Sequence, residues 1–162
     1  NDLNIFSSKF FTYQELKEII KAKKEKKKKI IMTNGCFDII HAGHIDYLKK
    51  AKQLGDLLII ALNTDSSIKK IKGDKRPINN LKDRIEVLSA LEYVDYIVSF
   101  DEETPLKIIK LIKPDVLVKG SDYNIEDIAG SEFIIKNGGR VELIDFTKNL
   151  STSKLISKLK NI

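Results

Sequence analysis

The sequence is poor in cysteine and has no long apolar run. Cys36 is the single cysteine, so no disulfide forms within the chain, and a reducing cytoplasm is the expected compartment. The longest uncharged apolar runs, such as residues 57–62, are too short to cross a bilayer, so no membrane partner is expected. No charged start followed by an apolar segment opens the sequence, and we therefore expect no secretory signal.

Two common catalytic signatures are also missing. The sequence has no G-x-S-x-G elbow to accompany a Ser-His-Asp set, and it has no Walker loop. It shows no internal repeat and no low-complexity linker. With 162 residues, 42% hydrophobic and 32% charged, the chain is long enough for one globular domain with a sizeable core.

The charge balance is basic, with a net charge of +6 from 29 Lys+Arg and 23 Asp+Glu. Six lysines, at position 23, at position 24 and over residues 26–29, account for the whole excess. Such a run is more typical of a solvated helix end than of a nucleic-acid or membrane surface. We therefore expect no nucleic-acid partner.

The first third of the chain predicts helices that alternate with short apolar strands. A helix is expected over residues 12–24, because Thr12 and Glu15 match a capping box and lysines collect at its other end. A strand over 29–33, a helix over 41–54 and a strand over 57–62 follow, with Gly55 as the C-cap of that helix. The polar stretch 63–80 reads as a long loop, and loops of this length are usually functional.

The rest of the chain continues the alternation. The expected helices cover 81–91, 104–112 (opened by Thr104 and Pro105), 125–137 and a final stretch from 152, and the strands cover 96–100, 116–119 and 140–144. This order predicts an α/β fold, a parallel sheet with helices on both faces. Ligands of such sheets bind at the carboxyl ends of the strands. Residues 1–27 are expected to form a helical extension of a domain over 28–162.

Both histidines of the sequence lie in the tetrad His41-Ala42-Gly43-His44, between the first strand and the next helix. Their i,i+3 spacing puts both imidazoles on one helix face, and Gly43 lets a ligand approach the backbone. The free amides of the helix start point at the same space and favour an anion. The tetrad therefore predicts a phosphate site; zinc is a weaker alternative because Cys36 would complete a poor ligand set.

The segment Thr33-Asn34-Gly35-Cys36-Phe37-Asp38 followed by this tetrad resembles the nucleotidylyltransferase superfamily with the HxGH signature. Other segments narrow the resemblance to the adenylyltransferase domain of bacterial ADP-heptose synthases, over about residues 28–160. They are residues 63–65, Lys72-Gly73 with Arg76-Pro77, 101–105, 114–122, 129–131 and 151–153. The resemblance implies a Rossmann-like nucleotidylyltransferase fold. It also implies transfer of AMP from ATP to D-glycero-β-D-manno-heptose 1-phosphate, for lipopolysaccharide core or another surface glycan.

The resemblance also implies the site. It makes His41, His44 and Lys72 catalytic, with Arg76 behind Lys72 in the loop. Asp38 is expected to bind a sugar hydroxyl or hold the loop rather than ligate metal, and Arg84 supports the loop, binds phosphate or forms a surface ion pair. The implied nucleotide-binding residues are Cys36, Phe37, His41, Gly43, His44, Lys119, Gly120, Asp122, Ser151, Thr152 and Ser153, and the substrate-binding residues are Asn34, Asp38, Lys72 and Arg76.

Residues 151–153 can also be interpreted on their own, because hydroxyls and free amides at a helix start suit either a second anion site or an ordinary N-cap. No general base is needed for this transfer, because a phosphate oxygen is already a nucleophile. Mg²⁺ is expected to arrive with ATP, with few protein ligands. The expected partners are ATP, a sugar phosphate, a second copy of the chain in a homodimer and a separate heptose kinase upstream.

Two other functions stay open. One is a cytidylyltransferase that acts on glycerol 3-phosphate or a similar alcohol phosphate. The other is a binding module without turnover, against which the intact histidine pair and Lys72 argue.

Overall fold

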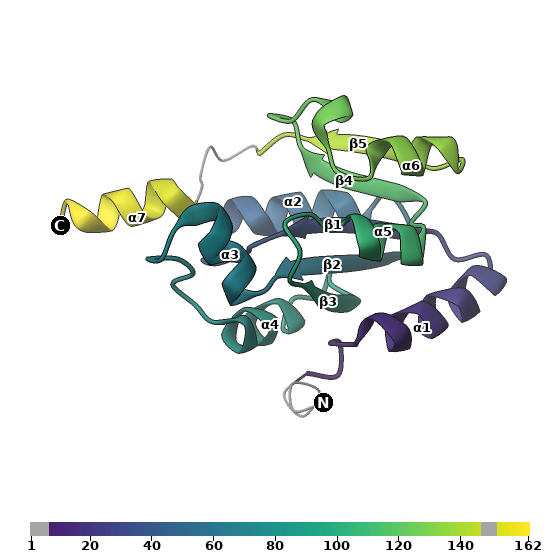
Figure 1. The fold of residues 1–162 in the computed structure, drawn as a ribbon, viewed down its shortest axis with the longest axis horizontal. Coiled ribbons are helices and arrows are strands. Elements are labelled where there is room, and N and C mark those ends of the chain that lie inside the picture. The colour runs from purple at the N-terminus through teal and green to yellow at the C-terminus, as the bar shows by residue number, and fades with distance from the viewer. Residues whose placement is uncertain (1–6, 147–151) are drawn as a thin grey trace.

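A sheet of five parallel strands organises the chain in a computed structural model that describes residues 7–146 and 152–162 (Figure 1). Its strands run in the order β3-β2-β1-β4-β5. The chain builds outward from β1 to β3 and then returns to the other side of β1, so the order reverses between β1 and β4. The predicted α/β class is confirmed. The strands are β1 (Ile30–Gly35), β2 (Leu57–Asn63), β3 (Tyr96–Phe100), β4 (Val116–Gly120) and β5 (Arg140–Ile144).

Helices cover both faces of this sheet. None of the helices in the described part of the chain is long and apolar enough to cross a membrane. The helices are α1 (Tyr13–Glu25), α2 (Ala42–Lys52), α3 (Asp65–Lys72), α4 (Leu81–Ser89), α5 (Leu106–Ile112), the 3-10 turn η2 (Ile125–Asp127), α6 (Ser131–Lys136) and α7 (Thr152–Lys160).

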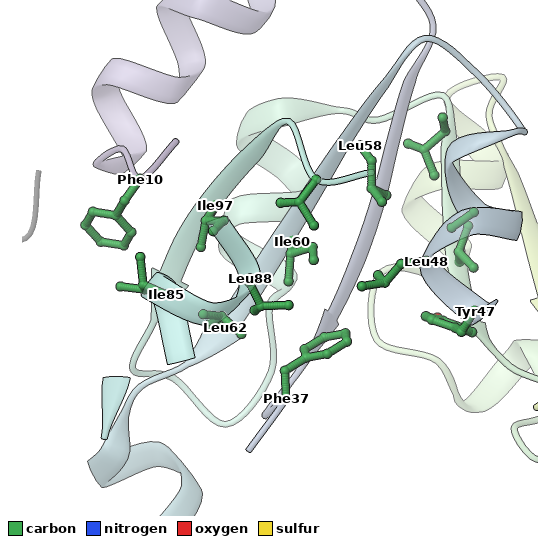
Figure 2. Close-up of a cluster of buried hydrophobic side chains, with 14 of the residues drawn as sticks. Phe10, Phe37, Tyr47, Leu48, Leu58, Ile60, Leu62, Ile85, Leu88 and Ile97 are labelled. Carbon is green, nitrogen blue, oxygen red and sulfur yellow. The ribbon is translucent and has the colours of Figure 1, made fainter. Parts of the chain in front are cut away.

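Alternate side chains of the buried strands pack into two separate hydrophobic cores, one on each face of the sheet. One core lies against α2 and α4 and contains Leu48, Leu88 and the aromatic rings of Phe37 and Tyr47 (Figure 2). The other lies against α1, α5 and α6 and contains Leu16, among others. Because β1, β2 and β4 are covered on both faces, their sequences read as continuous apolar runs rather than as alternating ones.

The predicted capping box at the start of α1 is confirmed. The Thr12 hydroxyl accepts from the Glu15 amide, and the Glu15 carboxylate accepts from the Thr12 amide. The same helix buries Leu16 and Ile20 completely or nearly so against the sheet. The described part of residues 1–27 therefore shares its core with the strands.

The prediction of one long loop over residues 63–80 is wrong in its first half. Residues 65–72 form α3, which Thr64 caps by accepting from the Ser67 amide. Its apolar positions are only Ile68, which is buried, and Ile71, which is exposed. These two positions lie on one helix face, but eight residues give too short an apolar pattern to mark a helix in the sequence, and tertiary contacts at its first turn stabilise it.

Other helix boundaries also differ from the prediction. Helix α2 ends at Lys52 with Gln53 as its C-cap, while Gly55 serves close packing, since a Cβ there would lie 2.5 Å from Ile31 Cδ1. Helix α5 starts one residue after Pro105, which is its N-cap without a side-chain bond, so Thr104 does not cap it.

The predicted helix over 125–137 is divided into η2 and α6. Gly130, at φ +87°, is the N-cap of α6, and a Cβ at this position would lie 2.8 Å from Ile109 Cδ1. The chain turns there because only glycine tolerates both the positive φ and the close approach of α5.

Candidate functional site

A pocket of about 250 Å³ opens at the carboxyl ends of β1 and β4, on the side of the sheet where α3 and α7 lie (Figure 1). The strand order reverses between these two strands, and ligands of such sheets bind at the carboxyl ends of the strands at this point. The pocket is lined by Asn34, Gly35, Cys36, Phe37, Asp38, His44, Tyr47, Lys72, Arg76, Lys119, Gly120, Asp122, Tyr123, Phe146 and Thr152.

Most of the site residues named from the sequence meet at this pocket, although they come from distant segments. His41 and Gly43 do not line it, although His41 packs against His44, which does, and Ser153 lies outside it. Ser151 falls outside the described residues. Thr152 lines the pocket and donates its hydroxyl to the Ile39 carbonyl at 3.2 Å, which ties the start of α7 to the segment before α2.

The two histidines cap α2 with their own rings. His41 Nδ1 accepts from the Gly43 amide at 3.1 Å, and His44 Nδ1 accepts from the His41 amide at 3.2 Å. The expectation that free amides of this helix start would all face an anion is therefore wrong for these two amides. Gly43 permits the arrangement, since a Cβ there would lie 2.9 Å from His41 Cε1.

Both imidazoles are neutral donors at neutral pH. Burial, with a smaller contribution from His41, lowers the pKa of His44 to about 4, and burial also lowers the pKa of His41. Because each Nδ1 accepts a hydrogen bond, each Nε2 carries the hydrogen. His41 Nε2 is buried without a hydrogen-bond partner among the described residues. An unpaired buried donor costs about 1–3 kcal/mol, which a ligand oxygen would recover.

Three cationic side chains reach the pocket from three elements. Lys72 is the exposed last residue of α3, and Arg76 follows in the next loop. Lys119, near the end of β4, donates from Nζ to the Asn34 carbonyl at 3.3 Å and lies 4.7 Å from the centre of the Tyr123 ring. Burial lowers the pKa of Lys119, while Asp122 and Cys36 act in the opposite direction.

Asp38 uses its carboxylate to hold the loop that carries Arg76. It accepts from Arg76 Nε at 2.9 Å and from the amides of Ile78 and Asn79 at 2.8 and 2.7 Å. Burial alone would raise the pKa of Asp38, but these donors outweigh it and the pKa is lowered. Its two oxygens are thus engaged inside the protein. Arg76 Nη2, by contrast, is buried with no hydrogen-bond partner in the described ranges.

Arg84 is not part of a surface ion pair. Its side chain is fully buried, and it bonds to three backbone carbonyls and to Asp65. Of the roles considered from the sequence, support of the loop is the one that these contacts match.

Three aromatic residues of the pocket were not named as site residues from the sequence. Phe146 stacks on Tyr47, with ring centroids 4.9 Å apart and planes 4° apart, and meets His44 edge-on at 6.4 Å. Tyr47 had a local signal, because it lies three residues after His44 on the same helix face. Tyr123 also had one, because it directly follows Asp122 after β4, whereas Phe146 had none, since it joins the site only through the sheet.

The pocket offers few ligands for a metal ion. No group of three or more His, Cys, Asp or Glu side chains that could hold a metal exists in the described ranges. Asp122 is the carboxylate of the pocket that does not bond to the 76–79 loop, and it lies so close to Gly120 that a Cβ there would be 2.6 Å from its Oδ1. Cys36 lies 3.9 Å from Asn63 Oδ1, a distance that permits only a weak thiol hydrogen bond.

Comparisons with known proteins agree on one family. A family model described as cytidylyltransferase-like matches residues 32–158. The chain is 52% identical over 151 residues to the bifunctional protein HldE of Actinobacillus succinogenes, covering 93% of this chain and 32% of that protein. It is also 52% identical over 156 residues to the HldE protein of Campylobacter concisus, with 96% and 32% covered. The chain thus spans about a third of the length of these curated relatives.

Solved structures show the same fold. A lipopolysaccharide core biosynthesis protein from Thermoplasma volcanium superposes with a TM-score of 0.59 at 32% identity, covering 74% of this chain and 97% of that one. The pantoate-beta-alanine ligase of Francisella tularensis also superposes with a TM-score of 0.59, over 94% of this chain and 78% of that one. At 16% identity, this second likeness concerns the fold alone.

Proposed function

The chain belongs to the cytidylyltransferase-like family, and from this we propose that it transfers AMP from ATP to D-glycero-β-D-manno-heptose 1-phosphate. The products are ADP-heptose and pyrophosphate, for the synthesis of lipopolysaccharide core or another surface glycan. The HldE relatives at 52% identity and the lipopolysaccharide core biosynthesis protein support this choice of acceptor. The observation that carries the proposal is the pair of neutral histidine donors beside a pocket that also holds Lys72, Arg76 and Lys119.

The reaction asks for alignment and charge stabilisation rather than for a base. A phosphate oxygen of the sugar phosphate forms a bond to the α-phosphorus of ATP. The bond from that phosphorus to the bridging oxygen of the β-phosphate breaks, and pyrophosphate leaves with the electron pair. Donors fixed at the places where negative charge develops lower the barrier, because they need no reorganisation during the reaction.

The chain's own residues divide this work. His41 and His44 donate from Nε2 to the nucleotide phosphates, since their Nδ1 atoms are engaged at the helix start. Lys72 neutralises charge on the reacting phosphates, and Arg76 binds the acceptor through its unpaired Nη2. The nucleotide is bound by Cys36, Phe37, Lys119, Gly120, Asp122 and residues 151–153. Asn34 and Asp38 act on the acceptor, and Asp38 does so by holding Arg76 in place.

Mg²⁺ enters with ATP as part of the substrate in this proposal. The pocket suits this arrangement, because Asp122 offers a carboxylate while the oxygens of Asp38 already accept from the 76–79 loop. The ion would neutralise triphosphate charge, and Mg²⁺ commonly binds through one or two carboxylates and the phosphates.

The wider setting is part of the same proposal. We expect the chain to act in the cytoplasm as a homodimer, on a sugar phosphate that a kinase supplies. Sedimentation at equilibrium tests the dimer.

The deciding experiment is pyrophosphate release with Mg²⁺ in a grid of substrates. ATP and CTP are each paired with the β-heptose 1-phosphate and with glycerol 3-phosphate, and His41→Ala and His44→Ala are assayed beside the parent chain. Turnover with ATP and the heptose phosphate alone, lost in both variants, is the expected result. Turnover with CTP and glycerol phosphate would replace the heptose assignment, and no release in any pairing would favour a binding module.

A further inference from the structure

Arg84 is a buried cation that lies outside the pocket yet contacts the segments that build it. It is 1% exposed and does not line the pocket. Its Nη1 donates to the carbonyls of Cys36 and Asn63 at 2.9 and 2.7 Å. Its Nε donates to the Asn79 carbonyl at 3.0 Å, and its Nη2 donates to Asp65 Oδ1 at 2.7 Å.

These partners lie on four different segments at the carboxyl ends of β1 and β2 and in the loop before α4. Cys36 follows β1 and lines the pocket, and Asn63 ends the neighbouring strand β2. Asp65 opens α3, whose last residue is Lys72. Asn79 lies in the loop that Asp38 holds and from which Arg76 reaches the pocket. One guanidinium therefore joins four segments, of which three carry candidate catalytic and binding side chains: the residues after β1, helix α3 and the loop of Arg76.

Helix α3 is fixed at its first turn and open at its last. Besides the Asp65–Arg84 contact, Asp101 accepts from the hydroxyls of Thr64 and Ser66. Ser67 donates to the Glu102 carbonyl. Lys72 at the other end is exposed, and a Cβ added at the following residue, Gly73, would meet no atom within 4 Å. The position of Lys72 over the pocket is therefore set at the end of α3 that Arg84 touches.

Arginine suits this place better than other side chains do. The planar guanidinium offers donors in fixed directions and meets several carbonyls at once, whereas lysine offers one compact charge. A buried cation is costly, and well-packed apolar residues often stabilise a fold equally well. The neighbours Ile85 and Leu88 on α4 are apolar and buried, so core packing alone does not call for a charge here.

We propose that Arg84 is a positioning residue, which sets the place of Lys72 and of the Cys36–Phe37 segment around the reacting phosphates without touching substrate. The role assigned to Lys72 rests on the proposed function, while the joining of the segments stands on the contacts alone.

The first test compares Arg84→Lys with Lys52→Met. Lys52 forms a partly buried ion pair with Asp95 at the amino ends of the strands, whereas the pocket lies at their carboxyl ends. Lys52→Met therefore measures how a loss of stability alone affects kcat. Misplacement of reacting groups by about 1 Å costs roughly 100-fold in rate. We expect Arg84→Lys, assayed well below its own Tm, to lower kcat about 30- to 100-fold, with kcat of the control unchanged. An unchanged kcat in Arg84→Lys would overturn the proposal.

A double-mutant cycle tests the route through α3 even if Arg84→Lys fails to fold. Asp65→Asn removes the negative charge from one of the four Arg84 contacts, the contact to α3, at a side chain that is 40% exposed. If the Asp65–Arg84 contact acts by placing Lys72, Asp65→Asn lowers kcat about tenfold in the parent chain. In the Lys72→Gln background, the same change lowers kcat by less than about twofold. Independent, additive effects would overturn the route.

Hydrogen exchange separates this proposal from the proposed function. In Arg84→Lys we expect faster amide exchange over 65–72 and 78–80, by about tenfold or more, with exchange in β5 and α6 unchanged. If the parent chain turns over none of the substrates, the function fails while this measurement still decides whether Arg84 joins the segments. Unchanged exchange in 65–72 and 78–80 would overturn the joining role.

Discussion

The two ends of β1 carry basic side chains in opposite settings. At the amino end, the exposed lysines of residues 26–29 lead into the strand. At the carboxyl end, Arg84 is buried, Arg76 is paired with Asp38 and Lys119 donates to the Asn34 carbonyl. Lysines 26–29 account for much of the net charge, yet their side chains form no hydrogen bond or ion pair within the described residues. Fixed contacts and burial, rather than the number of charges, distinguish the site.

Lys24 is the exception that supports this distinction. Its Nζ donates to the carbonyls of Ile112 and Lys113 at 3.0 and 2.5 Å, which satisfies the end of α5. Burial lowers its pKa, with Asp115 acting in the opposite direction. This lysine is held as firmly as those of the site, but its partners are backbone groups of a neighbouring helix, so its role is structural.

In the comparison of the two ends of β1, we expect the largest change in kcat from a substitution of His41. His41→Asn keeps an acceptor for the Gly43 amide but removes the unpaired Nε2 donor. Loss of one fixed donor to developing charge costs about 10²- to 10³-fold in kcat, so pyrophosphate release should fall by that factor at nearly unchanged Tm. Full activity in His41→Asn would remove the histidine pair from the mechanism. An equal loss in Lys28→Gln would break the comparison.

The second effect is a pH dependence of the free energy of unfolding, which we expect from His44 at the carboxyl end of β1. Folded His44 binds a proton near pH 4, whereas the unfolded chain binds it near pH 6.5, so the unfolded state holds more protons between these values. The free energy of unfolding should therefore rise with pH from 4 to 6.5, by at most about 3 kcal/mol from this residue. Urea titrations across this range measure it, with Lys28→Gln as the control that keeps the slope. The same slope in His44→Asn would assign it to other groups.

The third effect compares two exposed lysines of one segment. Lys72 lines the pocket and Lys75 does not. Lys72→Gln should lower kcat about 30-fold, because a charge near the reacting phosphates is lost, whereas Lys75→Gln should stay within about twofold. Neither change should alter the Tm, since both side chains are exposed. Equal losses in the two variants would indicate general attraction of anions rather than a placed contact.

The smallest effect is expected at the amino end of β1. The double variant Lys26→Gln, Lys28→Gln should change the free energy of unfolding by less than about 0.5 kcal/mol and leave turnover unaltered. We also expect no binding of duplex DNA at physiological salt. Salt-dependent DNA binding in the parent chain that weakens in this variant would make the lysine run a functional surface and overturn the comparison.

Local sequence signals located the regular elements well. The capping box at Thr12 and the apolar runs of β1 and β2 mark their elements, because caps and burial patterns repeat over a few residues. Helix α3 was missed, since its two apolar residues form too short a pattern, and contacts of Arg84 and Asp101 with its first turn help to hold it in place.

The sequence by itself determined the alternation of strands and helices and the place of the histidine tetrad at the start of α2. Only the tertiary structure decided which polar groups hold the site and which are left to face a ligand. Asp38 meets Asn79 across 41 positions, and Arg84 meets Cys36 across 48. Neither pairing leaves a local pattern, because parallel strands bring their carboxyl ends together only after the intervening helices have crossed the sheet.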